Sequence, residues 1–176
     1  MNSHARSKAV VSGSFDPITK GHLYVIEQAR KMADTVIVLV AHNPEKRYHF
    51  SLDERTKIIE ASIFEELGDA DGVVVQALPS GQFTATVAKH LGAHLVVRGL
   101  RNVVDFEYEH SQQLINSAIE PDVSTVFVMP PTDLIAVSSS AIKGMSGIEG
   151  WEAVAAKYVP AAALRALKGE PIDGSR

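Results

Sequence analysis

One ten-residue stretch, GSFDPITKGH at residues 13–22, combines residue types that suit phosphate chemistry. It follows the apolar run at residues 9–11 and precedes an amphipathic run, so it predicts a buried strand, a glycine turn and a helix whose first turn holds Gly21 and His22. Glycine lets the backbone approach a ligand closely, and a helix start offers unpaired N–H groups at the positive end of its dipole. A histidine there can donate a hydrogen bond to a phosphate. The stretch therefore predicts an anion-binding site.

Two arginines, Arg98 and Arg101, directly follow the apolar run at residues 95–97. A charge at the end of a buried strand is costly unless it is paired or faces a ligand, and a guanidinium fork suits phosphate. Both arginines therefore indicate further phosphate contacts. The carboxylates that follow within two helical turns either form an acidic helix surface or pair structurally with the arginines; they are Asp105, Glu107 and Glu109.

Two weaker signals come from Lys46 and from the serines at residues 138–140. Lys46 lies in a polar loop after a strand, where a basic residue is either a phosphate ligand or merely solvated. The serines act either as a helix N-cap or as a second anion site at a helix start. Nearby, Lys143 is expected to face solvent and Asp16 to form part of a turn.

Apolar runs alternate with amphipathic runs along the chain. We expect them to form the strands and helices that position these segments. The predicted strands are residues 9–12, 35–41, 73–78, 95–97 and 124–129. The predicted helices are residues 21–32, 52–67, 83–91, 104–119, a helix from 138 onward, 151–158 and 160–167. Ser51 and Glu54 have capping-box spacing before the second helix. Strands that alternate with helices imply right-handed βαβ units, so we expect an α/β protein with a doubly wound, parallel five-stranded sheet and C-terminal helices.

In such sheets, ligands bind outside the carboxyl ends of the strands. The four polar segments described above all follow predicted strands, so we expect one phosphate-binding cleft that they share. We expect a single domain over residues 1–176, with a core of about residues 8–168 and flexible ends at residues 1–7 and 169–176.

Composition excludes several classes of function. The chain has 176 residues, 45% of them hydrophobic, and a formal net charge of −4, which argues against a general nucleic-acid or membrane surface. It has no cysteine, so disulfides, thiol nucleophiles and zinc–thiolate sites are excluded. The histidines show no metal-site spacing, and no Walker or dinucleotide-binding loop is present. Without a signal-peptide or membrane-spanning pattern, a soluble cytoplasmic protein is expected.

Three motifs together resemble the bacterial phosphopantetheine adenylyltransferases, a family of the T/H-x-G-H nucleotidyltransferase superfamily. They are residues 13–22, the run RGLR at residues 98–101 followed by DFEYE at 105–109, and the serines at 138–140. Their order and spacing match from about residue 9 to residue 140. Other members of the superfamily share the first motif but not the second.

The resemblance implies a Rossmann-like nucleotidyltransferase fold and transfer of AMP from ATP to 4′-phosphopantetheine, which gives dephospho-CoA and pyrophosphate in coenzyme A synthesis. It also implies Mg²⁺ bound with ATP and a homohexamer. The implied catalytic residues are His22, Lys46 and Arg98, with His22 stabilising the transition state. The implied acceptor-binding residues are Ser14, Lys46, Thr84 and Arg98. The implied ATP-binding residues are Ser14, Phe15, His22, Gly99, Leu100, Arg101, Glu109, Leu134, Ile135, Ala136, Val137, Ser138, Ser139 and Ser140.

The chemistry of the residues agrees with direct in-line transfer. An acceptor phosphate is already a nucleophile, so neither a covalent enzyme intermediate nor a strong general base is needed. Residues 134–137 depart from the family, which usually has an aromatic residue and then Ser-Phe before the serines. Two alternatives remain open: a related nucleotidyltransferase with another phosphorylated acceptor, and a non-catalytic nucleotide or CoA sensor.

Overall fold

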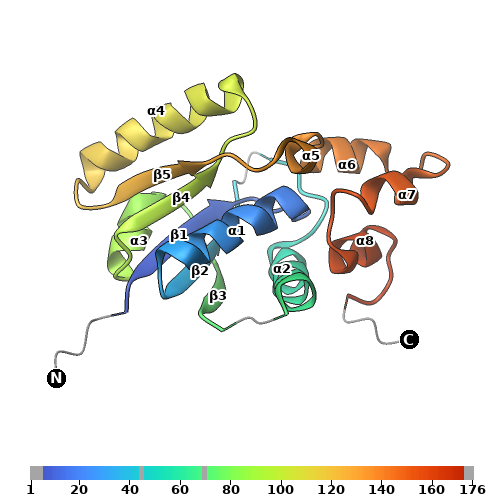
Figure 1. Ribbon diagram of the computed structural model, residues 1–176, viewed down its shortest axis with the longest axis horizontal. Coiled ribbons are helices and arrows are strands. Elements are labelled where there is room, and N and C mark those ends of the chain that lie inside the picture. Colours follow the sequence, from blue (N-terminus) through green and yellow to red (C-terminus); the bar gives the residue numbers. More distant parts are fainter. Residues whose placement is uncertain (1–5, 44–45, 69–70, 173–176) are drawn as a thin grey trace.

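The computed structural model describes residues 6–43, 46–68 and 71–172, with Ile135 as backbone only. One sheet of five parallel strands organises them, in the order β3-β2-β1-β4-β5 (Figure 1). The strands are β1 (Lys8–Gly13), β2 (Thr35–Val40), β3 (Val73–Ala77), β4 (Leu95–Gly99) and β5 (Ser124–Val128). The helices are α1 (Lys20–Met32), α2 (Leu52–Leu67), α3 (Thr84–His90), α4 (Val103–Ile119), α5 (Thr132–Ile135), α6 (Ser139–Met145), α7 (Trp151–Ala155) and α8 (Ala161–Leu167).

Helices cover both faces of the sheet, which confirms the doubly wound α/β fold. Alternate strand residues point to opposite faces. On one face, Val11 and Val38 pack in a core with α1, α2 and α8, and on the other Val10 and Leu39 pack with α3. β1 is central and pairs with both β2 and β4, so the strand order reverses there and the carboxyl ends of β1 and β4 flank the switch point.

Side-chain caps set the starts of the two long helices on the first face. Ser51 and Glu54 form the expected capping box of α2, and Gly68 ends that helix in the left-handed conformation. Thr19 and His22 form a second capping box at the start of α1. The Thr19 hydroxyl accepts the backbone N–H of His22, and the His22 ring accepts the N–H of Thr19. A residue expected at a ligand site therefore also fixes the start of its own helix.

Three elements differ from the sequence-based expectation. β4 runs on to Gly99, so Arg98 lies within the strand, paired in register with Phe127, rather than after it. The short helix α5 was not predicted, because its four residues follow two prolines and are too few to show a helical period. α7 ends at Ala155 rather than at Tyr158, because Pro160 has no N–H to continue the helical hydrogen bonds. The Tyr158 carbonyl instead accepts the backbone N–H of Lys20 at the start of α1.

The C-terminal helices, orange to red in Figure 1, gather at one end of the sheet, where α8 packs on α2. Of the tail expected to be flexible from Gly169 onward, the residues up to Ile172 lie against α8: Arg165 Nε donates to the Ile172 carbonyl at 3.1 Å. Residues 173–176 and 1–5 lie outside the described residues. In residues 6–43, 46–68 and 71–172, no helix combines the length and apolar character that crossing a bilayer requires.

Candidate active site

A cleft of about 800 Å³ opens at the carboxyl ends of the strands. All four polar segments predicted from the sequence contribute to its lining, together with α4 and the start of α3. The expected site residues that line it are Ser14, Phe15, His22, Lys46, Thr84, Arg98, Gly99, Arg101, Glu109, Leu134, Val137, Ser138, Ser139 and Ser140. Leu100 is instead buried, with its N–H bound to the Val128 carbonyl, and Ala136 is exposed at the end of α5. The side chain of Ile135 lies outside the described residues.

His22 is held in one tautomer. The backbone N–H of Thr19 donates to His22 Nδ1 at 3.0 Å, so Nδ1 is an acceptor and the proton of the neutral ring lies on Nε2. Burial lowers the pKa of His22 to about 4, and the charges of Arg101 and Arg98 act in the same direction. At neutral pH the imidazole is therefore an uncharged ring whose remaining polar atom, Nε2–H, is a hydrogen-bond donor.

The turn before His22 is strained. Phe15 has φ of +48°, a left-handed conformation that costs energy in a residue with a side chain. Its buried ring contacts the His22 ring edge-on, with centroids 5.1 Å apart. A Cβ on Gly13 would meet the Phe15 ring at 3.0 Å, which explains the glycine at the end of β1. The strained turn thus packs one aromatic ring between Gly13 and the imidazole.

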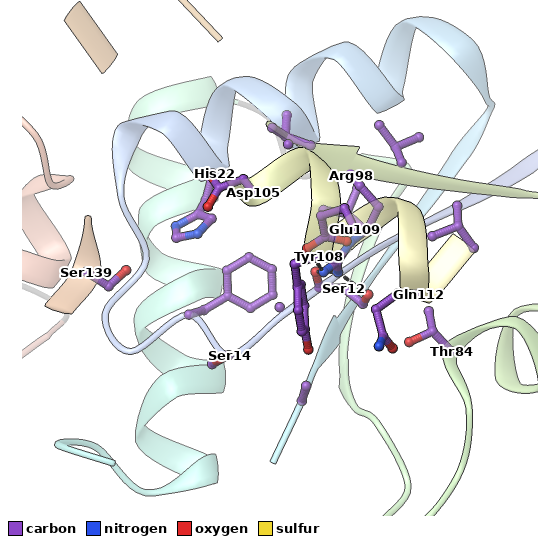
Figure 2. A pocket seen from close by; sticks show the side chains of 18 of the residues that line it. Ser12, Ser14, His22, Thr84, Arg98, Asp105, Tyr108, Glu109, Gln112 and Ser139 are labelled. Carbon is purple, nitrogen blue, oxygen red and sulfur yellow. Dashed lines mark hydrogen bonds and ion pairs between the residues drawn. The ribbon is translucent and has the colours of Figure 1, made fainter. Parts of the chain in front are cut away.

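Four of the five N–H groups of Arg98 bond within the protein itself (Figure 2). Its Nε and Nη2 donate to the two oxygens of Glu109 at 2.6 and 2.5 Å, and its Nη1 donates to Ser12 Oγ at 2.7 Å and to the Ser12 carbonyl. Arg101 pairs in the same bidentate way with Asp105 at 2.7 and 2.9 Å. Of the two interpretations of these carboxylates, structural pairing is therefore the one adopted by Asp105 and Glu109.

The serines at the start of α6 are partly used inside the protein. Ser138 is the N-cap, since its Oγ accepts the backbone N–H of Ala141 at 3.2 Å. Ser139 Oγ donates to the Pro17 carbonyl at 2.8 Å, which ties α6 to the turn between β1 and α1. Ser140 is exposed, and its hydroxyl has no hydrogen-bond partner in the described part of the chain. Lys46 is likewise exposed, at the rim of the cleft.

Sequence reasoning missed three charged residues that support the site. Arg55 is completely buried; its Nη1 donates to the carbonyls of Ser14 at 2.6 Å and Ala41 at 2.8 Å, and its guanidinium carbon lies 4.2 Å from the centre of the Tyr48 ring. The helical spacing between Arg55 and the apolar residues of α2 already indicates in the sequence that Arg55 lies on the buried face. The other two, Asp16 and Lys143, form an ion pair at 2.5 Å. Asp16 does lie in the expected turn, but the expectation that Lys143 faces solvent is wrong, since its side chain is only 26% exposed.

The cleft offers a bound cation few free ligands from the protein. Its lining carboxylates, Asp105 and Glu109, are both paired with arginines. Across the described ranges, no three His, Asp or Glu side chains converge as a metal-binding group.

Comparison with known proteins finds relatives that match most of the chain. The family model for cytidylyltransferase-like proteins matches residues 10–145. The phosphopantetheine adenylyltransferase of Chromobacterium violaceum is 38% identical over 160 residues, which cover 91% of this chain and 94% of that protein. The phosphopantetheine adenylyltransferase of Alkaliphilus oremlandii is 44% identical over 142 residues, which cover 81% of this chain and 87% of that protein.

More distant solved structures share the fold. Thermotoga maritima TmcAL bound with alpha-thio ATP superposes with a TM-score of 0.59 at 15% identity, covering 93% of this chain and 55% of that one. A bifunctional NMN adenylyltransferase/ADP ribose pyrophosphatase of Francisella tularensis, complexed with AMP and a manganese ion, has a TM-score of 0.52 at 22% identity over 75% of this chain and 41% of that one. The family model and the close relatives together establish that the chain belongs to the cytidylyltransferase-like family and, within it, to the phosphopantetheine adenylyltransferases, which are nucleotidyltransferases.

Proposed function

We propose that the chain transfers the adenylyl group of ATP to 4′-phosphopantetheine and releases dephospho-CoA and pyrophosphate. The names of its relatives support the two substrates. The observation that carries the proposal is the neutral His22, whose Nε2–H lies in the same cleft as the three cationic side chains Lys46, Arg98 and Arg101. A neutral donor among cations suits a phosphate that gains charge in the transition state.

The reaction is a direct in-line displacement. A phosphate oxygen of phosphopantetheine attacks the α-phosphorus of ATP; the new P–O bond forms as the bond from the α-phosphorus to the β-phosphate oxygen breaks, and pyrophosphate leaves. The acceptor phosphate is already a nucleophile at neutral pH, so no side chain needs to remove a proton. Catalysis then consists of holding the two phosphates in line and stabilising the charge that develops between them.

The expected site residues that line the cleft each have a role in this scheme. His22 Nε2–H donates to the α-phosphate, Ser14 and Lys46 bind phosphate oxygens, and Arg98 binds the acceptor phosphate. The pantetheine arm passes Thr84 at the start of α3. The adenosine and remaining phosphate contacts come from the other expected residues that line the cleft: Phe15, Gly99, Arg101, Glu109, Leu134, Val137, Ser138, Ser139 and Ser140.

Three features complete the proposal. Mg²⁺ enters with ATP as part of the substrate complex, which fits the ion-paired carboxylates of the cleft. The protein acts in the cytoplasm as a homohexamer, as the family resemblance implies. Exposed apolar side chains on α4 support burial of that helix against another subunit; they are Val103, Val104, Phe106, Leu114 and Ile115.

Pyrophosphate release measured with ATP and a panel of phosphorylated acceptors tests the function. We expect rapid release with 4′-phosphopantetheine and at least about a hundredfold lower kcat/KM with nicotinamide mononucleotide or nicotinate mononucleotide, because those acceptors lack the pantetheine arm. A clear preference for another acceptor would favour the related-nucleotidyltransferase alternative, which the departure at residues 134–137 motivates. ATP binding without turnover on any acceptor would favour the sensor.

A further inference from the structure

Three segments that line the cleft meet at one buried carboxylate. Asp16, only 4% exposed, accepts the backbone N–H groups of His49 and Phe50, each at 3.0 Å, and the Nζ of Lys143 at 2.5 Å. Asp16 belongs to the turn between β1 and α1, His49 and Phe50 to the loop that leads from β2 to α2, and Lys143 to α6. Partners that lie 33, 34 and 127 residues away in sequence are thus joined through one side chain.

Each of these segments carries residues of the proposed site. The turn between β1 and α1 carries Ser14 and His22, the loop after β2 carries Lys46, and α6 begins at the serines. Asp16 and Lys143 themselves are not among the residues that line the cleft. Any effect they have on the reaction must therefore pass through the segments that they hold together.

The contact fixes α6 at two successive turns. Ser139 Oγ donates to the carbonyl of Pro17, and one turn later Lys143 pairs with Asp16. Burial alone would raise the pKa of Asp16, but the hydrogen bonds from Lys143, His49 and Phe50 outweigh it and leave the pKa below its usual value. The carboxylate is therefore ionised at neutral pH. Loss of one partner from such a buried pair leaves the other charge uncompensated.

We propose that Asp16 and Lys143 are positioning residues for the adenylyl transfer: their ion pair holds the Lys46 loop and α6 at a fixed distance from His22, so that their donors converge on the phosphates of ATP. This inference rests on the proposed function. The relevant role is alignment of groups that lie on separate segments, because displacement of a phosphate ligand by about 1 Å can cost up to a hundredfold in rate.

The test compares Lys143→Met with a matched control at another ion pair. Lys168 pairs with Glu170 at 2.5 Å beyond α8, so Lys168→Met removes the same side chain from a pair outside the cleft. ATP affinity is measured by calorimetric titration and kcat by pyrophosphate release, for both variants and for Lys143→Arg, which keeps the charge next to Asp16.

For Lys143→Met we expect the Kd for ATP to rise about fivefold, equivalent to the loss of about one hydrogen bond, and kcat to fall about tenfold. Lys143→Arg should recover both values to within about threefold, and Lys168→Met should match the unmodified protein in both. A purely structural role would lower the melting temperature of Lys143→Met but leave the ATP affinity of its folded fraction unchanged.

The proposal is overturned if Lys143→Met, folded by circular dichroism, binds ATP as the unmodified protein does, or if Lys168→Met loses as much affinity. Failure of the proposed function looks different: the unmodified protein would bind ATP but release no pyrophosphate with phosphopantetheine. The ATP affinities would then still decide the positioning role.

Discussion

The two sides of the cleft are built differently. We call the turn at residues 13–22, the loop residues 41–43 and 46–50, and α6 the braced wall. We call residues 95–119, which comprise β4, α4 and the turn between them, the helix wall. In the braced wall, Asp16 accepts the backbone N–H of Phe50, and the buried Arg55 of the adjoining helix α2 donates to the carbonyls of Ser14 and Ala41. In the helix wall, α4 has no buried residue. Its carboxylates Glu109 and Asp105 pair with Arg98 and Arg101 of the same wall.

The difference indicates which wall can bind a ligand without first rearranging its hydrogen bonds. In the braced wall, His22 already has its donor directed by Thr19 and needs no rearrangement to meet a phosphate. In the helix wall, four of the five N–H groups of Arg98 already donate to Glu109 and Ser12, so more than one hydrogen bond to the acceptor requires Arg98 to exchange a partner (Figure 2). Donors arranged in advance avoid reorganisation during the reaction. We therefore expect catalytic rate to depend mainly on the braced wall and acceptor affinity on the helix wall.

The largest effect is expected in the braced wall for His22→Ala. Removal of the Nε2–H donor takes away an interaction that strengthens in the transition state, so kcat should fall by at least about a hundredfold while the Kd for ATP changes by less than about fivefold. Steady-state pyrophosphate release and ATP titration measure the two quantities. Unchanged turnover would remove His22 from the mechanism, and an equal loss in both quantities would make it only a binding residue.

Arg55→Met should have the next largest effect, on stability. It leaves the buried carbonyls of Ser14 and Ala41 without their donor, so we expect the free energy of unfolding to fall by about 3 kcal/mol. Urea denaturation followed by circular dichroism measures it. Arg47→Met, at an exposed arginine of the loop before α2, is the control and should change stability by less than about 0.5 kcal/mol. Equal stability of the two variants would show that the hydrogen bonds of Arg55 to Ser14 and Ala41 do not stabilise the fold.

The contrast between the walls also explains what the sequence could predict. All five strands were predicted, because runs such as residues 35–40 are apolar and β-branched where both faces of the sheet are covered. The capping box at Ser51 revealed α2, and the positions after the strands indicated the cleft. These signals are local, so a single sequence contains them.

The braces of the site could not be found in this way. Asp16 and Lys143 are 127 residues apart, and no spacing within either segment indicates that they meet. The sequence allows two roles for Arg98, because a charged residue after a strand can bind a ligand or pair with a neighbouring side chain such as Glu109. Arg55 is the exception: its place among the apolar residues of α2, between Leu52 and Ile58, was visible as a charge on a buried face.

In the helix wall, Glu109→Gln should have a moderate effect on the acceptor. The variant weakens the clamp on Arg98 and leaves its N–H groups more readily available to the acceptor, so we expect the KM for phosphopantetheine to fall about threefold. We expect kcat to change by less than about twofold, since the amide oxygen of the variant still accepts a hydrogen bond from Arg98. Steady-state kinetics with varied acceptor measures both. A loss in kcat as large as that of His22→Ala would show that the helix wall also carries the chemistry and would end the distinction.

The smallest effect is expected from protonation of His22. Because its pKa is lowered from 6.5 to about 4, the ring stays neutral above about pH 4 and keeps its Nε2–H donor throughout the physiological range. In the profile of kcat against pH, no step at pH 6–7 should therefore arise from His22. The unmodified protein and His22→Gln should have profiles of the same shape in this range. NMR titration of the imidazole, assigned with the same variant, should place its midpoint well below pH 6. A midpoint near 6.5 would contradict the buried, neutral ring.

A crystal structure with a non-hydrolysable ATP analogue tests the central claim most directly. The account predicts a phosphate oxygen within hydrogen-bonding distance of His22 Nε2, with the Asp16–Lys143 pair unchanged and the Arg98–Glu109 contact still made until an acceptor binds. A triphosphate bound along α4 away from His22, or a braced wall rearranged around the nucleotide, would contradict it.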